Sequence, residues 1–330
     1  MKKIHVLSIA LVVLALIVVP VVTGCGGTKA TTTTAAPTTT TAPSTETTAA
    51  AGAYDISKIV AGITVDASIV VPDKYKGGTV KVGSDAPYPP WEMFVGTTDQ
   101  FTGFDYDLGQ AIGAKLGVKF EFVKTSFDSI IIGIQAGNLD VAMSSMYDNR
   151  ARQNTVDFVD YARDGTGMLV LKGNPNKISS FNDLAGKNVG CEKGTTQADA
   201  LTTLNDAFKT QGKPQMTISQ FPDQPSALLA VQSGKVVCDL TDSSTGGYVA
   251  LQTDNGATFQ IIMDPDPPEG WESQPDGIAV LKSNSDLRDA IQKALQALMD
   301  DGTYQNILAQ YGIQPWDEAS INAGTQPGAQ

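Results

Sequence analysis

The sequence of 330 residues contains a single histidine, His5, close to its N-terminus. Ser-His-Asp and Cys-His nucleophilic systems need an imidazole base, and most zinc sites in proteins include histidine ligands. The rest of the chain therefore excludes these nucleophilic systems and most zinc sites, whereas chemistry carried by carboxylates stays available. We expect no metal and no cofactor.

Basic residues are also scarce, because 23 Lys and Arg stand against 35 Asp and Glu and give a formal net charge of −12. A chain with this balance repels nucleic acid and anionic lipid headgroups. The sequence has no basic cluster that would reverse the effect. We expect no nucleic-acid partner.

Cysteine occurs three times, and two of the three lie far apart in the second half of the chain, at Cys191 and Cys238. An even pair of cysteines in an oxidising compartment can form a disulfide. The alternative is two small buried residues in apolar strands, because both cysteines stand in runs that read as interior strands. The sequence leaves these two alternatives open.

Residues 1–24 have two lysines directly after Met1 and continue as an apolar run to Val22, and Cys25 follows them. A basic start, an apolar run and small residues at the exit predict a secretory signal. With cysteine as the first residue after the cut, it resembles a bacterial lipoprotein signal, in which Cys25 would carry the lipid. The alternative is a transmembrane anchor, but Pro20 and the Thr-Gly-Cys-Gly exit favour cleavage. We expect an extracytoplasmic protein that lipid on Cys25 holds to the cell membrane.

Two segments have little apolar bulk. Residues 25–53 are rich in Thr, Ala and Pro, which predicts a disordered, lipid-anchored tether. Residues 315–330 are polar and rich in Gly and Ala, and we expect them to form a loose tail.

Between these segments, β-rich runs alternate with helical patterns. Strands are predicted at 79–83, 119–123, 140–143, 156–159, 167–171, 188–191, 215–221, 235–241, 259–262 and 277–281. Helices are predicted at 106–116, 128–135, 197–208, 225–233, after Asp242, and at 286–299 and 303–311. Strands that alternate with helices indicate parallel α/β sheets, and two successive units of this kind indicate two lobes joined by crossing strands.

Short motifs punctuate this alternation in a fixed order. They read GSDAPYPPWE at 83–92, GFDYDL at 103–108, FDSII at 127–131, LDVAM at 139–143, DLAGKNVG at 183–190, GTTQ at 194–197, GIAV at 277–280 and DGTY at 301–304. In this order and spacing, over residues 77–312, they resemble the polar amino-acid-binding family of solute-binding proteins. This is family 3 of the bacterial extracellular solute-binding proteins, the receptors of ABC importers.

The resemblance implies an α/β, bilobal periplasmic-binding-protein fold, a Venus flytrap with the ligand between its lobes. Lobe 1 would comprise 54–163 and 274–314, and lobe 2 would comprise 164–273. Two crossing segments, near 164–167 and 265–274, would form a two-segment hinge.

The resemblance also implies which residues bind the ligand, and they include both charged groups and aromatic walls. The implied set is Asp85, Tyr88, Trp91, Phe127, Ser144, Ser145, Tyr147, Arg152, Thr196 and Asp242. Arg152 stands at the family position that binds the α-carboxylate, where a guanidinium forms two parallel hydrogen bonds. Backbone N–H groups of Tyr147 and of Thr196, at a helix N-terminus, would assist it. Asp242 stands at the family position for the α-ammonium.

The remaining members of this set would surround the ligand side chain. Tyr88, Trp91 and Phe127 would enclose its aliphatic part, Ser144 and Ser145 would form hydrogen bonds, and Asp85 would face its end.

Each assignment has a plainer alternative. Asp242 can cap the helix that follows it, and Arg152 can be a solvated surface charge. Trp91 and Phe127 can be ordinary core residues. Glu92 is common in its motif and can have a structural role. The chain also departs from the family at Tyr147, where a small hydroxyl residue is usual.

These residues predict a receptor that binds a free amino acid, polar or cationic, and delivers it to an ABC permease and ATPase. No bond is made or broken, so we expect no enzyme, and we expect a monomer. One alternative is a periplasmic enzyme on the same scaffold, similar to cyclohexadienyl dehydratases, with Glu92 or Asp85 as general acid. Another is a module that senses the ligand.

Overall fold

The computed structural model describes residues 54–263 and 270–325. The chain divides into two units, Met1–Ala50 and Ala51–Gln330, and all of the described residues belong to the second unit. The predicted signal, Cys25, the tether, residues 265–269 of the second crossing segment and residues 326–330 lie outside the described residues.

One mixed sheet runs through the described residues. Its strands are β1 Thr79–Ser84, β4 Lys119–Lys124, β5 Val141–Ala142, β6 Val156–Leu171, β7 Asn188–Glu192, β8 Thr217–Phe221, β9 Cys238–Asp242, β10 Phe259–Ile262, β11 Trp271–Leu281 and β12 Gln314–Pro315. The order is β4-β1-β5-β11-β6-β9-β7-β8, and β10 and β12 also pair with β6. Within this order, β4, β1 and β5 are parallel, as are β9, β7 and β8, whereas β6 and β11 run antiparallel to their neighbours. The parallel sheets expected from the sequence are therefore two parallel blocks joined by antiparallel strands.

Helices cover this sheet. They are α1 Ile56–Gly62, α2 Phe104–Leu116, α3 Phe127–Gln135, α4 Thr196–Thr210, α5 Gln224–Gln232, α6 Ser243–Gln252, α7 Ser285–Asp300 and α8 Thr303–Leu308. Helix α2 buries Leu108, Ile112 and Leu116, the spacing that predicted it, and it ends at Gly117, whose φ of 69° is left-handed. The sequence did not predict α1 or the short hairpin of β2 Met93–Phe94 and β3 Phe101–Thr102.

The two lobes each have a hydrophobic core, which confirms the predicted pair of α/β lobes. In lobe 1, Leu108 of α2 and Leu295 of α7 are fully buried in one cluster with Val82 of β1. In lobe 2, Leu201 of α4 packs in a separate cluster with Leu240 of β9.

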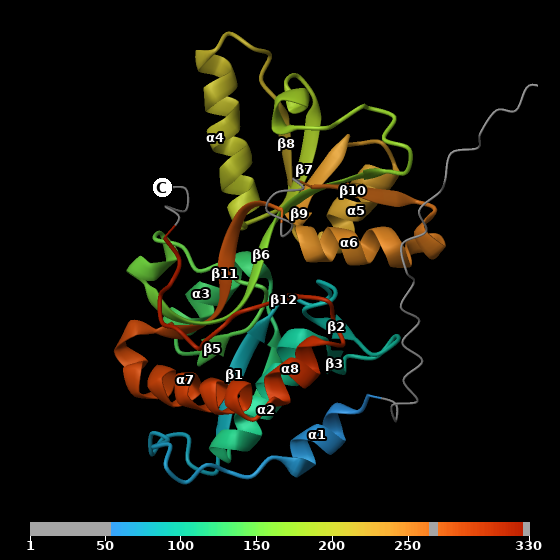
Figure 1. Ribbon diagram of the computed structural model, residues 1–330. Helices are drawn as coiled ribbons and strands as arrows, with labels where there is room; N and C mark the ends of the chain where they lie inside the picture. Colours follow the sequence, from blue (N-terminus) through green and yellow to red (C-terminus); the bar gives the residue numbers. More distant parts are fainter. Residues whose placement is uncertain (1–53, 264–269, 326–330) are drawn as a thin grey trace, which may run out of the picture. The chain divides into compact units, whose positions relative to one another are not determined.

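Two long strands, β6 and β11, cross between the lobes (Figure 1). From Val156 to Thr166, β6 pairs with β11, and from Thr166 to Leu169 it pairs with β9 of lobe 2. The register between β6 and β11 shifts between Trp271 and Gln274, next to the point where β6 changes partner. The sequence predicted two strands where the single strand β6 is found.

The predicted loose tail is wrong over residues 315–325. Pro315 belongs to β12, and Ile321 forms a β-bridge with Val159 of β6. The backbone N–H of Gly324 donates to the Asp148 carboxylate at 2.6 Å. Polar composition did not imply disorder here, because the backbone of this segment finds partners on β6.

Cys191 and Cys238 are free, buried thiols on the neighbouring strands β7 and β9. Their residues are offset in the register, because Cys191 faces Leu240 and Cys238 faces Val189. Of the two alternatives left by the sequence, the structure has separate buried thiols. Burial raises the pKa of the Cys191 thiol to about 12, so it stays protonated at neutral pH.

In the part of the chain that the structure describes, no helix is long and apolar enough to cross a membrane.

Candidate functional site

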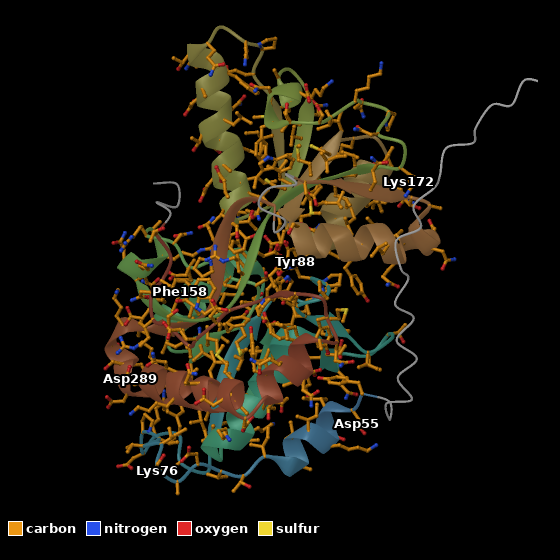
Figure 2. The ribbon with its side chains drawn as sticks, viewed as in Figure 1. Asp55, Lys76, Tyr88, Phe158, Lys172 and Asp289 are labelled. Carbon is orange, nitrogen blue, oxygen red and sulfur yellow. The ribbon has the colours of Figure 1, made fainter. Side chains whose placement is uncertain are left out.

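A pocket with about 320 Å³ of empty space lies between the lobes, and both lobes line it. The predicted residues that line it are Asp85, Tyr88, Phe127, Ser144, Ser145, Tyr147, Arg152, Thr196 and Asp242. Tyr88 lies where the two lobes face each other (Figure 2). Its hydroxyl forms a hydrogen bond of 2.9 Å with the Thr241 hydroxyl of lobe 2.

One end of the pocket carries a positive charge, the guanidinium of Arg152. Its Nη1 donates to the Tyr147 carbonyl at 2.8 Å, and its Nη2 donates to the Gly194 carbonyl of lobe 2 at 3.3 Å. Burial lowers the pKa of Arg152 to about 10, so the guanidinium is charged at pH 7. The group also lies 5.3 Å from the centre of the Phe127 ring, close enough for a cation–π contact.

The N-terminus of α4 lies at the same pocket. Thr195 caps this helix, because its hydroxyl accepts a hydrogen bond from the Ala198 N–H. Thr196 is the first residue of the helix and lines the pocket. The first backbone N–H groups of a helix have no acceptor within it, and the helix dipole favours an anion there. Arg152 and Thr196 therefore suit a carboxylate.

Asp242 brings a carboxyl group to the same pocket. It ends β9, and its carboxylate accepts hydrogen bonds from Ser145 Oγ at 2.9 Å and Gln197 Nε2 at 2.7 Å. Its side chain forms no capping bond with α6, so the capping alternative does not describe it. Burial raises the pKa of the Asp242 carboxyl, and a bound cation would favour its ionised form.

Trp91 does not line the pocket, and the core alternative describes it instead. Its ring is fully buried and packs edge-on against Phe104 and Tyr161, with centroids 5.8 and 6.3 Å away. Its Nε1 donates to Ser244 Oγ of lobe 2 at 2.8 Å. Trp91 thus connects the core of lobe 1 to the other lobe.

Glu92 lines the pocket, although the sequence gave no means to distinguish this from a structural role. It is fully buried, and its Oε1 accepts a hydrogen bond from Ser144 Oγ at 2.5 Å. Its carboxyl also lies in hydrogen-bonding contact with the carboxyl of Asp105. Burial and the nearby Asp105 carboxyl raise the pKa of Glu92 well above its usual value.

Sequence reasoning missed Glu192, Thr195 and Gln197, which line the pocket from lobe 2. Glu192 ends strand β7, and the carboxyl ends of parallel strands are the usual place for ligands in open α/β sheets. That rule is the signal that would have found it. Its carboxyl lies in hydrogen-bonding contact with the carboxyl of Asp85 from lobe 1.

Among residues 54–263 and 270–325, no group of three or more His, Cys, Asp or Glu is placed to hold a metal ion. The residues that line the pocket carry one guanidinium, several carboxyls, aromatic rings and hydroxyls.

The profile of the bacterial extracellular solute-binding proteins, family 3, matches residues 80–314. The chain is 28% identical over 248 residues to the arginine-binding protein ArgT of Corynebacterium glutamicum, covering 74% of this chain and 78% of that protein. It is 27% identical to the lysine/arginine/ornithine-binding periplasmic protein of Escherichia coli, over 71% of this chain and 87% of that protein.

Solved structures give the same result. An ancestral arginine-binding protein bound to arginine is 34% identical, with a TM-score of 0.62, and the match covers 71% of this chain and 98% of that one. An ancestral amino-acid-binding protein, a precursor of cyclohexadienyl dehydratase, is 32% identical, with a TM-score of 0.59 over 71% of this chain and 95% of that one.

Proposed function

This chain belongs to family 3 of the bacterial extracellular solute-binding proteins, and on that premise we propose that it is a lipid-anchored amino-acid receptor. It takes up a free amino acid, polar or cationic, between its two lobes and delivers it to an ABC importer. The relatives named above for arginine, lysine and ornithine support an amino acid as the ligand.

One observation carries the proposal: Arg152 and Asp242 line the same pocket from opposite lobes. A free amino acid presents a carboxylate and an ammonium on one carbon atom, and these groups match the guanidinium and the carboxylate. Lobe 1 thus supplies the cation for the ligand carboxylate, and lobe 2 supplies the carboxylate for the ligand ammonium. Binding the ligand therefore favours closing the lobes.

Cys25 is the proposed site of the lipid, and residues 25–53 are the proposed tether. A flexible chain of this length spans about 30 Å. Such a tether keeps the receptor near its permease while leaving it free to reorient, which raises the local concentration. We propose that the protein works as a monomer with a permease and an ATPase as partners.

Calorimetry of the mature protein tests the proposal, after bound ligand has been removed by unfolding and refolding. Titration with each common amino acid is expected to show tight binding of at least one. No heat with any of them would contradict the proposal.

An enzyme on the same scaffold is the second candidate, and Glu92 is the observation that favours it. A buried carboxyl in a pocket, with a raised pKa, is suited to act as a general acid. The ancestral neighbour that is a precursor of cyclohexadienyl dehydratase has the same fold. Turnover of prephenate or arogenate by the purified protein would favour this candidate over the receptor.

A ligand-sensing module would use the same pocket and give the same calorimetry. Stimulation of the ATPase of a reconstituted permease by the liganded protein would favour transport, and no stimulation would favour sensing.

A further inference from the structure

We infer, on the basis of the proposed function, that the ligand carries a cationic side chain and that Glu192 of lobe 2 selects it together with Asp85 of lobe 1. Glu192 lines the pocket and lies outside every motif that carried the resemblance. The proposed function assigns the α-carboxylate to Arg152 and the α-ammonium to Asp242, which leaves Glu192 available for the side chain.

The two carboxyls reach each other from opposite lobes. Asp85 directly follows β1, and Glu192 ends β7. Asp85 is held in place because its Oδ2 accepts a hydrogen bond of 2.7 Å from the Phe127 N–H. Only 8% of Asp85 and 4% of Glu192 is exposed, so their contact is closed off from water that would screen it.

The surroundings of this pair are mostly acidic. Glu92, with Asp105 behind it, lies on the lobe 1 side, and Asp223 and Asp239 act on the pair from lobe 2. The charge of Lys124 lowers the pKa of Asp85 and partly opposes the effect of burial. The neighbouring Lys193 forms its salt bridge with Asp128 at 2.7 Å. Arg152 donates to the carbonyls of Tyr147 and Gly194.

Two carboxylates in contact at such a site cannot both be ionised, so the pair keeps a proton while the lobes are closed without a cation. Burial is the main cause that raises the pKa of Glu192 to about 10, and contact with Asp85 is the second cause. Burial also raises the pKa of Asp85.

A cationic side chain changes this balance. Placed between the two carboxyls, a guanidinium or ammonium allows both to ionise, and the shared proton goes to solvent. A neutral side chain of the same shape leaves the proton on the pair. The closed complexes of a cationic ligand and of its neutral isostere therefore differ by about one proton at this pair, whatever the conformation of the empty protein.

Glu92 supplies an independent observation at the same place. Glu92 is fully buried and lines the pocket, and its carboxyl contacts the carboxyl of Asp105, so this pair also holds a proton that a cation would displace. A planar guanidinium presents five donors in a fixed fork, whereas an ammonium presents three. The extra carboxyl favours a guanidinium, and we expect arginine to bind more tightly than lysine.

Calorimetry with arginine and citrulline tests this inference, because citrulline replaces the guanidinium with a neutral urea group. Each titration is done at pH 7 in two buffers of different ionisation enthalpy, which gives the number of protons exchanged. We expect arginine to bind at least about tenfold more tightly. We also expect the two ligands to differ by at least about one proton.

Glu192→Gln is the diagnostic variant, and Glu121→Gln on the exposed face of β4 is its matched control. We expect Glu192→Gln to lower the arginine-to-citrulline affinity ratio about tenfold or more and to reduce the proton difference by about one proton. Glu121→Gln should change neither quantity. Asp85→Asn should act in the same direction as Glu192→Gln.

Equal affinities for arginine and citrulline, or a ratio that Glu192→Gln leaves unchanged, would overturn the inference. Should Glu192→Gln fail to fold, the proton difference measured on the unaltered protein decides. Tight binding of neutral amino acids alone would refute the inference and leave the proposed function intact. Absence of binding by any amino acid would instead refute the proposed function.

Discussion

At the scale of single residues, Arg152 has the most direct consequence for binding. A ligand carboxylate that enters the pocket loses its water and must be paired. We expect Arg152→Ala to weaken binding by about 3 kcal/mol or more, roughly a hundredfold. Calorimetry measures the loss.

Arg150→Ala is the matched control, since Arg150 is exposed and contacts Gln153 at 3.3 Å. An Arg152→Ala protein that binds as tightly as the unaltered protein would contradict the assigned role.

Trp91 is expected to affect closing through a single hydrogen bond. Trp91→Phe keeps an aromatic ring against Phe104 but removes the Nε1–H that reaches Ser244 across the lobes. We expect the ligand affinity to fall about twofold to tenfold, the usual net value of one hydrogen bond. Calorimetry on the variant measures this change.

Ser244→Ala removes the acceptor without touching the core of lobe 1. Ser244→Ala also removes the hydrogen bond that the Ser244 hydroxyl donates to Asp164. Because the bond between Trp91 and Ser244 is already absent in Ser244→Ala, the double variant should lose little more than Ser244→Ala alone. Fully additive losses would show that Trp91 acts through its packing instead.

Residue types and order predicted many of the residues that line the pocket, but not all of them. Arg152 and Asp242 could be predicted because their chemistry and spacing follow the family. The position of Trp91 could not be predicted, because the sequence around it has no periodicity that distinguishes a residue lining the pocket from a residue buried in the core. The end of β7 was a signal for Glu192, but its contact with Asp85 could not be predicted, because that contact depends on how closely the two lobes approach each other.

At the scale of elements, the segment 319–324 acts as a strap on β6. Asp160 N–H donates to the Ser320 carbonyl at 3.0 Å, and Ala323 N–H donates to the Asp160 carboxylate at 2.9 Å. The Phe158 N–H donates to Asn322 Oδ1 at 2.8 Å. These bonds occupy the lobe 1 part of the strand that crosses to lobe 2.

We expect deletion of residues 319–330 to lower the free energy of unfolding by about 3 kcal/mol, since several hydrogen bonds of about 1 kcal/mol each are lost. Urea denaturation measures this change. Deletion of 326–330 alone is the control and should have little effect. If the two deletions had the same effect, the strap would not stabilise the fold.

The elements that the sequence predicted well are those with a strong period. Helix α2 has apolar residues at helical spacing, and α5 begins at the Asp223 cap with proline in its first turn. Strand β6 was divided in the prediction because charged residues, including Arg163 and Asp164, interrupt its apolar run. The strand continues through these residues because β6 pairs there with β11. In this pairing Arg163 lies opposite Pro275, and Asp164 lies opposite Gln274.

At the scale of the whole molecule, buried carboxyls determine how stability depends on pH. Burial raises the pKa of Asp105 to about 6 and those of Asp160, Asp164 and Asp239 to about 7. The described residues, 54–263 and 270–325, contain no histidine whose imidazole would titrate in this range. Titration between pH 5 and 7 is therefore governed by these carboxyls.

The direction of the effect follows from the raised values. Between the unfolded pKa near 3.8 and the folded values of about 6 to 7, the folded protein holds more protons than the unfolded chain. Stability therefore rises as the pH falls from about 7 to about 5. Below about pH 4, carboxylates with lowered pKa, such as Asp157 beside Lys282, lose their ion pairs and reverse the trend.

We expect the free energy of unfolding to be larger at pH 5.5 than at pH 7.5, each buried carboxyl contributing up to about 1.4 kcal/mol per pH unit. Urea denaturation at several pH values measures this slope. Asp239→Asn removes one titrating group while its amide oxygen can still accept the hydrogen bond from Gln224 Nε2, which is 2.9 Å long in the unaltered protein. The slope of this variant should be shallower, because one carboxyl no longer needs a proton to stay buried. A slope of the opposite sign in the unaltered protein would show that these carboxyls are ionised in the fold, which would require cations or water at each of them.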